Sequence, residues 1–314
     1  MRPLKLGIFL PVFEGSDEAF FGMFPRTLRW PELLRFVQTT ETIGFDSVWI
    51  PDHLLFRFEG EQGPSHGLWE AWSILSALAA ATERVELGTL VLCTAFRNPA
   101  LLAKMADTVD EVSGGRLVLG LGAGYQEPEF RAFGYPFDRL VTRFEEALTI
   151  VTTLLREGSI DFEGQDYSAR DCELRPRAAR AGGPPVLVGG RTGPRMLRLA
   201  AERADLWNSW LVFDRSHPDK VPPVREQLDA ACIAAGRDPA SLERTVTVMV
   251  VPPGQEPVGM SPEVQPVVGS AEEVAETLRG FAHEGIAQLQ LVLNPYTEAA
   301  VESMAPVLAL LDRN

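Results

Sequence analysis

The feature that most constrains the fold is a regular alternation of apolar runs with helix-like segments. Eight apolar runs cover 4–12, 45–50, 85–93, 116–122, 185–190, 205–212, 245–251 and 288–294. A helix-like segment follows each run, and continuous apolar runs of this length are typical of buried parallel strands. Eight such strand–helix units within 314 residues predict an α/β fold, a (β/α)8 TIM barrel that forms one domain over residues 1–314.

Proline, glycine and asparagine mark the ends of several predicted helices. Pro31 and Pro99 stand where helices would begin, and Gly44 stands where the first helix would end. Asn98 is expected to cap the helix that Pro99 opens. Long insertions follow strands 1, 4 and 7, and the polar excursion 157–183 is one of them. We expect them on or next to the face where barrel enzymes place their sites.

Charge and composition argue against several classes of function. The net charge of −14 disfavours nucleic acid as a partner, because phosphate binding needs a basic surface. No apolar run reaches the roughly 18 residues of a membrane span, and no signal peptide is evident at the start. We therefore expect a cytoplasmic protein without a membrane partner. Its three cysteines are expected to be free thiols, and no cluster has the spacing of metal ligands.

The fourth apolar run ends in Gly120, Gly122 and Gly124, which is nearly the spacing of a dinucleotide-binding turn. That turn requires a helix to begin within it, and Pro128 and Pro136 disturb any long helix after these glycines. A nicotinamide dehydrogenase is therefore a minor alternative. The glycines would instead let the strand curve and end, or let a flat ligand approach the backbone. These two interpretations are compatible.

The fifth run ends in Gly189-Gly190 and leads into a helix near Pro194. Glycine-rich turns before a helix present backbone N–H groups and the positive end of the helix dipole to an anion. Arg191 and Thr192 would add donors, as would Arg195. The turn is a candidate phosphate cradle, and an ordinary connecting turn is the alternative.

Asp52 and His53 follow the second run, at the strand end where barrel enzymes gather functional residues. Histidine exchanges a proton near neutral pH, so His53 is a candidate acid or base and Asp52 its companion. The alternative is that Asp52 caps a loop and His53 is an ordinary polar residue. His66 is a second histidine that could reach this place, whereas Glu127 and Glu129 are interpreted as solvated loop charges.

Aromatic side chains gather in the segments after the first and second runs. They would line an apolar substrate pocket, or they would pack the long loops together. These residues are Phe20, Phe21, Phe24, Trp30, Phe56, Phe58 and Trp69.

Four stretches, 44–53, 83–134, 189–208 and 269–293, together resemble the bacterial-luciferase-like superfamily of FMN- or coenzyme F420-dependent oxidoreductases. The resemblance implies a (β/α)8 barrel with the cofactor across the carboxyl ends of its strands. It places the cofactor phosphate at Gly189 and Gly190 with the following Arg191 and Thr192. It also places the cofactor ring on a bulge at Leu90-Val91, where members often have a non-proline cis peptide.

The resemblance further implies that residues Gly122, Ala123, Gly124 and Tyr125 border the cofactor. Asp52-His53 matches the family's pair after strand 2, and His53 is the residue closest to a catalytic role.

The choice between FMN and F420 stays open at this point. FMN-type members oxygenate a substrate with O2, and deazaflavin-type members transfer hydride. The Asp-His pair favours F420, whereas an aromatic residue at Tyr125, where deazaflavin members commonly have an acid, disfavours it. The resemblance also suggests a homodimer that acts on a small organic molecule, with a separate flavin or F420 reductase as a partner. A flavin-binding protein without turnover is the alternative from another class.

Overall fold

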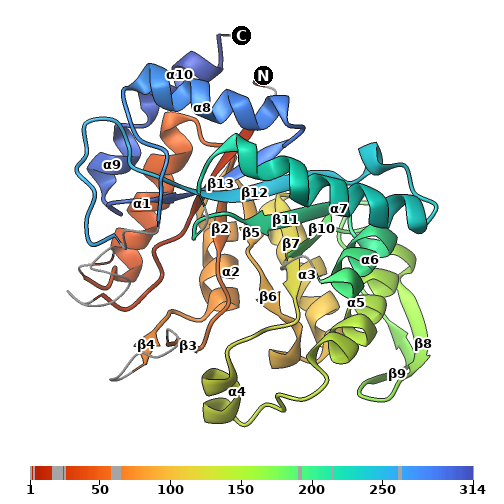
Figure 1. Ribbon diagram of the computed structural model, residues 1–314. Coiled ribbons are helices and arrows are strands. Elements are labelled where there is room, and N and C mark those ends of the chain that lie inside the picture. The colour runs from red at the N-terminus through yellow and green to blue at the C-terminus, as the bar shows by residue number, and fades with distance from the viewer. Residues whose placement is uncertain are drawn as a thin grey trace.

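Eight parallel strands form a closed barrel in the computed structural model (Figure 1), which describes all residues except 1, 3, 16–23, 25, 58–64, 190–192, 214, 261–263 and 314. In order around the barrel they are β1 (Lys5–Phe9), β2 (Ser47–Ile50), β5 (Glu86–Thr89), β7 (Leu117–Gly122), β10 (Val186–Gly189), β11 (Leu206–Trp210), β12 (Glu243–Val250) and β13 (Gln288–Leu293). Pairing of β13 with β1 and of β7 with β10 completes the closure. The (β/α)8 prediction is confirmed.

Helices cover the outside of the barrel. They are α1 (Trp30–Ile43), α2 (Ala71–Ala81), α3 (Pro99–Ser113), α5 (Leu140–Glu157), α6 (Pro194–Arg203), α7 (Val221–Ala234), α8 (Ala271–His283), α9 (Glu298–Glu302) and α10 (Ala305–Leu311). Asn98 caps α3, because its side-chain oxygen accepts the N–H groups of Ala100 and Leu101. The last helix is two helices rather than one over 298–311, because Pro306 cannot donate a helical hydrogen bond and opens the second.

Short strands and a short helix lie in the connections between the barrel strands and the outer helices. β3 (Leu55–Phe56) pairs with β4 (His66–Gly67) after β2, β6 (Leu92–Cys93) extends the end of β5, and α4 (Glu127–Phe133) follows β7. The polar excursion 157–183 contains a hairpin of β8 (Ser159–Glu163) and β9 (Ser168–Glu173). This hairpin follows helix α5 rather than a strand. Its turn lies against α5, where the Glu146 carboxylate accepts the N–H groups of residues 165–167.

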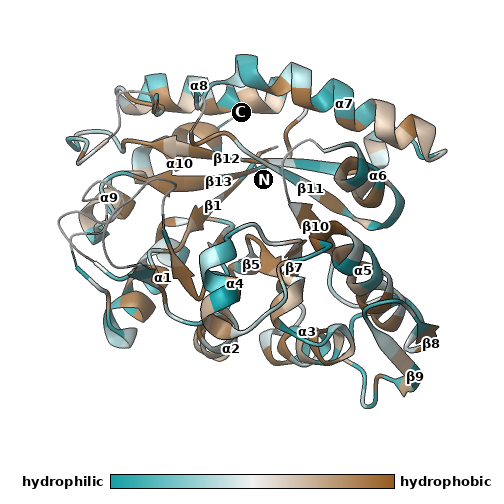
Figure 2. Ribbon diagram, turned by 60° about the horizontal axis from the view of Figure 1, so that its bottom comes forward, coloured by the Kyte–Doolittle hydropathy of each residue, from teal (hydrophilic) through white to brown (hydrophobic). Residues whose placement is uncertain are grey.

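One large side chain fills the barrel interior on the side of β1, β2 and β5. Trp49 is fully buried, and a Cβ at Gly7 or Gly88 would lie 2.6 or 2.2 Å from its ring atoms. On the other side, buried Asn208 donates to Gln290 and Thr245 at 2.8 and 2.9 Å. Most barrel strands are brown in the hydropathy view, and teal gathers on the helices (Figure 2). The packed interior leaves the carboxyl ends of the strands, which we call the mouth, as the place for chemistry.

Candidate functional site

His53 is held from one side by a carboxylate. Its Nδ1 lies 3.0 Å from Glu129 Oε1, and the other oxygen of Glu129 accepts the N–H of Leu54 at 2.9 Å. A carboxylate only accepts hydrogen bonds, so Nδ1 carries the hydrogen in the neutral ring and Nε2 carries the lone pair. Nε2 lies 3.4 Å from the hydroxyl of Tyr125, whose side chain is exposed. His53 therefore presents its basic nitrogen on the side of Tyr125.

The interpretation of Glu129 as a solvated charge is wrong. The Glu129 side chain is 2% exposed, whereas Glu127 of the same helix is exposed. The neighbouring Phe130 is fully buried against Phe96 and draws this turn of α4 inward. The sequence signal for the burial of Glu129 is its position beside Phe130 in a short helix. The distance along the chain between Glu129 and His53 carries no information about their contact.

Asp52 points away from His53, as neighbours in extended backbone do. Its carboxylate accepts two hydrogen bonds from the Arg97 guanidinium, at 2.7 and 3.0 Å, and the N–H of Cys93 at 2.9 Å. Burial opposes the charge of Arg97, but the hydrogen bonds and attraction from Asp52 and Glu70 outweigh it and raise the Arg97 pKa. Asp52 thus joins the end of β2 to the loop between β5 and α3. No local pattern in the sequence indicates that Arg97 pairs with Asp52.

The peptide between Leu90 and Val91 is cis, as the family resemblance implied. Leu90 is buried and Val91 is half-buried at the mouth. A Cβ at Gly122 would lie 2.6 Å from one methyl of Val91, and a Cβ at Gly189 would lie 2.7 Å from the other. The glycines that end β7 and β10 are therefore required by the close approach of Val91.

The remaining glycines of the fourth run serve the same corner of the barrel. A Cβ at Gly120 would lie 1.9 Å from the backbone oxygen of Thr89, and one at Gly124 would lie 2.6 Å from Cys93 Sγ. Helix α4 begins only at Glu127, beyond the glycine turn. The described geometry therefore matches close backbone approach and not a dinucleotide-binding turn. Ala123 lies half-buried beside these glycines.

Gly122→Ala is expected to destabilise the fold, because the new methyl group overlaps Val91. Overpacking of this kind lowers the free energy of unfolding, measured by urea denaturation, by about 1–3 kcal/mol. The double variant Gly122→Ala/Val91→Gly removes the overlapping side chain and should recover part of this loss. Equal stabilities of the single and double variants would contradict the assignment of the glycine to Val91.

The turn after β10 is only partly described. Gly189 ends β10, whereas Gly190, Arg191 and Thr192 lie outside the described residues. Helix α6 begins at Pro194, its N-cap Gly193 has no side chain, and its first turn holds no acid. Its N–H groups and dipole therefore suit a phosphate. Arg195 is engaged elsewhere, in an ion pair with Glu145.

These observations fit a flavin-type cofactor. The half-buried Val91 and the glycine strand ends offer an apolar, side-chain-poor surface for a flat ring. The start of α6 lies one connection beyond Gly189 and offers donors for the phosphate. Among the described residues, no group of three or more His, Cys, Asp or Glu could hold a metal ion.

Burial, followed by the charge of Asp52, raises the pKa of the Cys93 thiol above its ordinary value. The thiol therefore stays protonated and unreactive at pH 8. Iodoacetamide on the native protein is expected to label the half-buried Cys172 and to leave Cys93 intact, as measured by peptide mass spectrometry. Denatured protein, labelled at all cysteines, is the control. Rapid labelling of native Cys93 would contradict this environment.

The aromatic residues singled out in the sequence divide into several groups. Phe56 contacts the His53 ring edge-on at 5.1 Å. Phe24 is buried and stacks on Phe13, and Trp69 donates its indole N–H to the backbone oxygen of Leu28. Trp30, at the start of α1, is 37% exposed. Phe20, Phe21 and Phe58 lie outside the described residues.

His66 lies half-buried on β4, where it pairs with Phe56 of β3.

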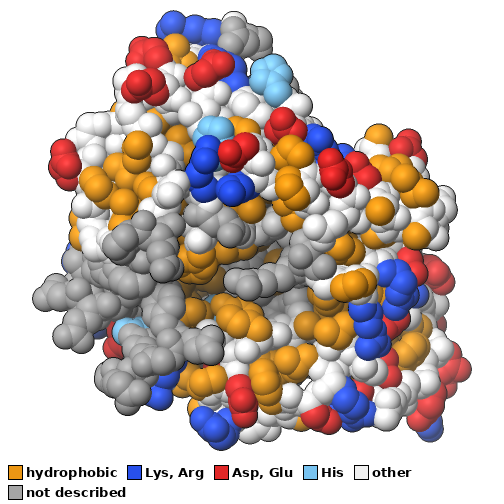
Figure 3. Space-filling model, in the orientation of Figure 1, with side chains coloured by type: hydrophobic (Ala, Val, Ile, Leu, Met, Phe, Trp, Pro, Cys, Tyr) orange, Lys and Arg blue, Asp and Glu red, His pale blue; other side chains and the backbone are white. Residues whose placement is uncertain are grey.

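The space-filling view shows a hollow in the middle of one face, with hydrophobic side chains inside it (Figure 3).

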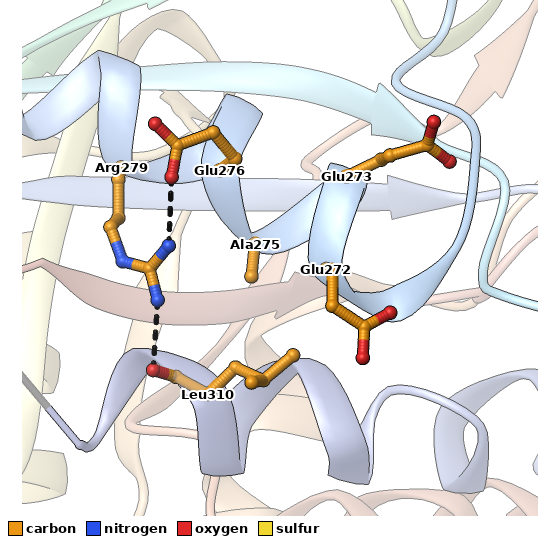
Figure 4. A pocket seen from close by; sticks show the side chains of 6 residues that line it. All are labelled: Glu272, Glu273, Ala275, Glu276, Arg279 and Leu310. Carbon is orange, nitrogen blue, oxygen red and sulfur yellow. Dashed lines mark hydrogen bonds and ion pairs between the residues drawn. The ribbon is translucent and has the colours of Figure 1, made fainter.

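Two cavities lie away from His53. One of about 310 Å³ is lined by Phe24, Phe36 and Tyr296 with charged residues of α1 and α9. The other, of about 350 Å³, lies between α8 and α10, where Arg279 binds Glu276 and the backbone oxygen of Leu310 (Figure 4). Among the described residues that line these cavities, only Phe24 is one that the sequence singled out. No helix within the described ranges is long and apolar enough to cross a bilayer.

Comparison with known families and proteins gives a consistent picture. A family model described as luciferase-like monooxygenase matches residues 4–253. The chain is 31% identical over 218 residues to a 5,10-methylenetetrahydromethanopterin reductase of Archaeoglobus fulgidus, which covers 69% of this chain and 59% of the reductase. It is 32% identical to an F420-dependent glucose-6-phosphate dehydrogenase of Kineococcus radiotolerans, over 79% of this chain and 68% of the relative.

A pyrimidine monooxygenase RutA of Cronobacter turicensis is 28% identical, over 76% of this chain and 63% of the relative. Among solved structures, an F420-dependent secondary alcohol dehydrogenase superposes with a TM-score of 0.77 at 19% identity and covers 99% of both chains. A riboflavin lyase superposes with a TM-score of 0.81 at 15% identity, over 99% of this chain and 92% of the lyase. At these identities the structural likeness supports the fold alone.

Proposed function

Because the chain belongs to the luciferase-like monooxygenase family, we propose that it is an oxidoreductase that transfers hydride between coenzyme F420 and a small alcohol or carbonyl compound. The observation that carries the proposal is His53, a histidine at the mouth whose Nδ1 is bound by a buried carboxylate. Dehydrogenation of an alcohol requires one group to accept the hydroxyl proton, and His53 Nε2 suits that role.

The relatives favour F420 over FMN. The dehydrogenase of Kineococcus radiotolerans is F420-dependent by name and is more similar to this chain than the pyrimidine monooxygenase is. The Asp52-His53 pair, which resembles the deazaflavin members, agrees with this choice. We propose that Leu90, Val91, Gly122, Ala123, Gly124 and Tyr125 border the ring, and that Gly189, Gly190, Arg191 and Thr192 hold the phosphate.

The coenzyme would supply or accept the hydride, and the protein would handle the proton. In the oxidative direction His53 Nε2 takes the hydroxyl proton while the substrate carbon loses hydride. Glu129 keeps its hydrogen bond to Nδ1 and stabilises the imidazolium that forms. Asp52 is a positioning residue in this scheme, because it binds Arg97 and the N–H of Cys93, close in the chain to Leu90-Val91.

Cofactor titration followed by anaerobic turnover tests the proposal. We expect F420 to bind more tightly than FMN in a fluorescence titration, and its absorbance to fall when a panel of alcohols is added. Binding of F420 without reaction over a broad panel would favour a flavin-binding protein without turnover. Selective binding of FMN would remove F420 from the proposal.

FMN-dependent monooxygenation is the second candidate function, and Tyr125 is the observation that favours it. Tyr125 places a phenol, not a carboxylate, beside His53 Nε2. In the presence of O2, the enzyme should then consume reduced FMN together with a substrate. A separate reductase would have to supply the reduced FMN. Oxygen consumption that depends on substrate distinguishes this candidate from F420 chemistry.

We further propose a homodimer through α2 and α3. The outward face of α3 carries Leu101 and Val112, which are 55% and 53% exposed, and α2 is rich in alanine. Leu101 and Val112 are separated by about three helical turns, so they lie on the same side of α3 and supply its apolar contact points. Sedimentation of the wild type and of Leu101→Glu/Val112→Glu tests the idea, with a shift to monomer as the expected result and an unchanged dimer against it.

A further inference from the structure

Two aromatic side chains from non-adjacent strands meet inside the mouth. Phe9 ends β1 and Trp210 ends β11, and their rings touch edge-on with centroids 5.5 Å apart. In the barrel order, β12 and β13 lie between these two strands. The contact therefore crosses the mouth above β12 and β13.

Strand alternation shows that both side chains face the barrel interior. A Cβ at Gly7, two residues before Phe9, would meet the interior Trp49. Asn208, two residues before Trp210, binds the interior Gln290. Residues two apart on a strand share a face, so Phe9 and Trp210 form the last interior layer on their side of the barrel.

The two aromatic side chains differ in how much of their surface is exposed. Phe9 is 5% exposed, whereas Trp210 is 37% exposed although it faces inward. Phe213 follows at a centroid distance of 6.1 Å from Trp210 and is 52% exposed. We call Phe9, Trp210 and Phe213 the aromatic wall. Its exposed apolar surface comes from Trp210 and Phe213, and the buried Phe9 packs against Trp210. His53, Val91, Gly122 and Gly189 belong to the other half, which is built by β2, β5, β7 and β10.

We propose that the aromatic wall binds the body of the substrate, and that this body is apolar: an aliphatic or aromatic alcohol or carbonyl compound rather than a sugar phosphate. The inference rests on the proposed function, which places the reacting oxygen of the substrate at His53 and the ring of the cofactor at Val91. The wall offers a single hydrogen-bonding group, the indole N–H of Trp210. A polyol bound there would lose water from several hydroxyl groups without gaining partners, whereas an alkyl or aryl group gains from burial.

Ligand-observed saturation-transfer NMR tests the inference without requiring turnover. Cyclohexanol and glucose 6-phosphate are the probes, each added to the protein with and without F420. We expect cyclohexanol to bind and glucose 6-phosphate to bind more weakly or not at all. Preference for glucose 6-phosphate would overturn the inference.

Substitutions then locate the binding. Trp210→Ala is expected to weaken cyclohexanol binding by about tenfold, whereas Trp210→Phe keeps an aromatic ring and should retain most of it. Phe213→Ser changes an exposed side chain and should weaken binding without threatening the fold. Ile233→Ala, a change at a 68% exposed apolar residue of α7, is the matched control and should bind as the wild type does.

The possible results separate the wall from the proposed function. Cyclohexanol binding that depends on Trp210 supports the wall even if F420 turnover fails, and that failure then counts against the proposed function alone. Unchanged binding in folded Trp210→Ala and Phe213→Ser variants overturns the wall, even if F420 turnover succeeds.

Discussion

Replacing His53 with alanine is expected to lower turnover by about 10²–10⁴-fold and to leave the dissociation constant of the cofactor nearly unchanged. The loss follows from the proposed role of His53, whose Nε2 would exchange the substrate proton. Because the His53 side chain is 17% exposed, its removal leaves a space that water or a small base can enter. Added imidazole should therefore restore part of the lost rate. The measurement is the anaerobic rate of F420 reduction at saturating substrate.

Two variants make this result specific. Glu129→Gln keeps a hydrogen-bond acceptor for Nδ1 but loses the charge, so it should lower turnover less than His53→Ala does. His217→Asn is the matched control, because His217 is exposed and paired with Asp219 on the surface. Unchanged turnover in His53→Ala, or a loss in His217→Asn of the same size, would remove His53 from the mechanism.

The largest effect on stability is expected from Asp52→Ala. This change leaves the Arg97 guanidinium, whose side chain is 11% exposed, without its bidentate partner, and it frees the N–H of Cys93. Breaking a buried ion pair by removing one partner costs about 3–5 kcal/mol of unfolding free energy. Glu70 still contacts Arg97 at 2.6 Å, so the loss should fall near the lower end of this range. Urea unfolding with linear extrapolation gives the measurement.

An exposed ion pair supplies the comparison for Asp52. Glu202 pairs with Arg198 one turn away on α6, and both side chains are well exposed. Glu202→Gln should therefore change the unfolding free energy by less than about 0.5 kcal/mol. If Asp52→Ala costs no more than Glu202→Gln, the assignment of Asp52 as a brace between β2 and the loop after β5 is wrong.

Much of the fold could be predicted because its signals are local. Continuous apolar runs define the barrel strands, and residues such as Asn98 and Gly44 mark helix ends by their own backbone preferences. The division of 298–311 at Pro306 was missed, although proline carries a local signal. The sequence predicts the excursion 157–183 on or next to the mouth of the barrel, and in the structure its hairpin follows helix α5. Its polar composition did not specify the hairpin.

The candidate site was predictable only in part. Strand ends gather at one face of a barrel, so His53, Tyr125 and Gly189 could be assigned to the mouth from their positions in the chain. The roles of these residues stay predictions that the proposed experiments test. The burial of Glu129 could not be predicted, because it depends on how α4 docks, and Phe130 sets that docking through its contact with Phe96 of another loop.

The sequence by itself determined the barrel, because strand and helix periodicity and end signals act over a few residues. Only the tertiary structure decided which side chains meet. Glu129 reaches His53 across 76 positions and Arg97 reaches Asp52 across 45, while Val91 packs against glycines of two other strands. The physical reason is that each of these contacts joins segments of the mouth that are far apart in the sequence. Their distances are set by strand order and helix docking, which no local pattern encodes.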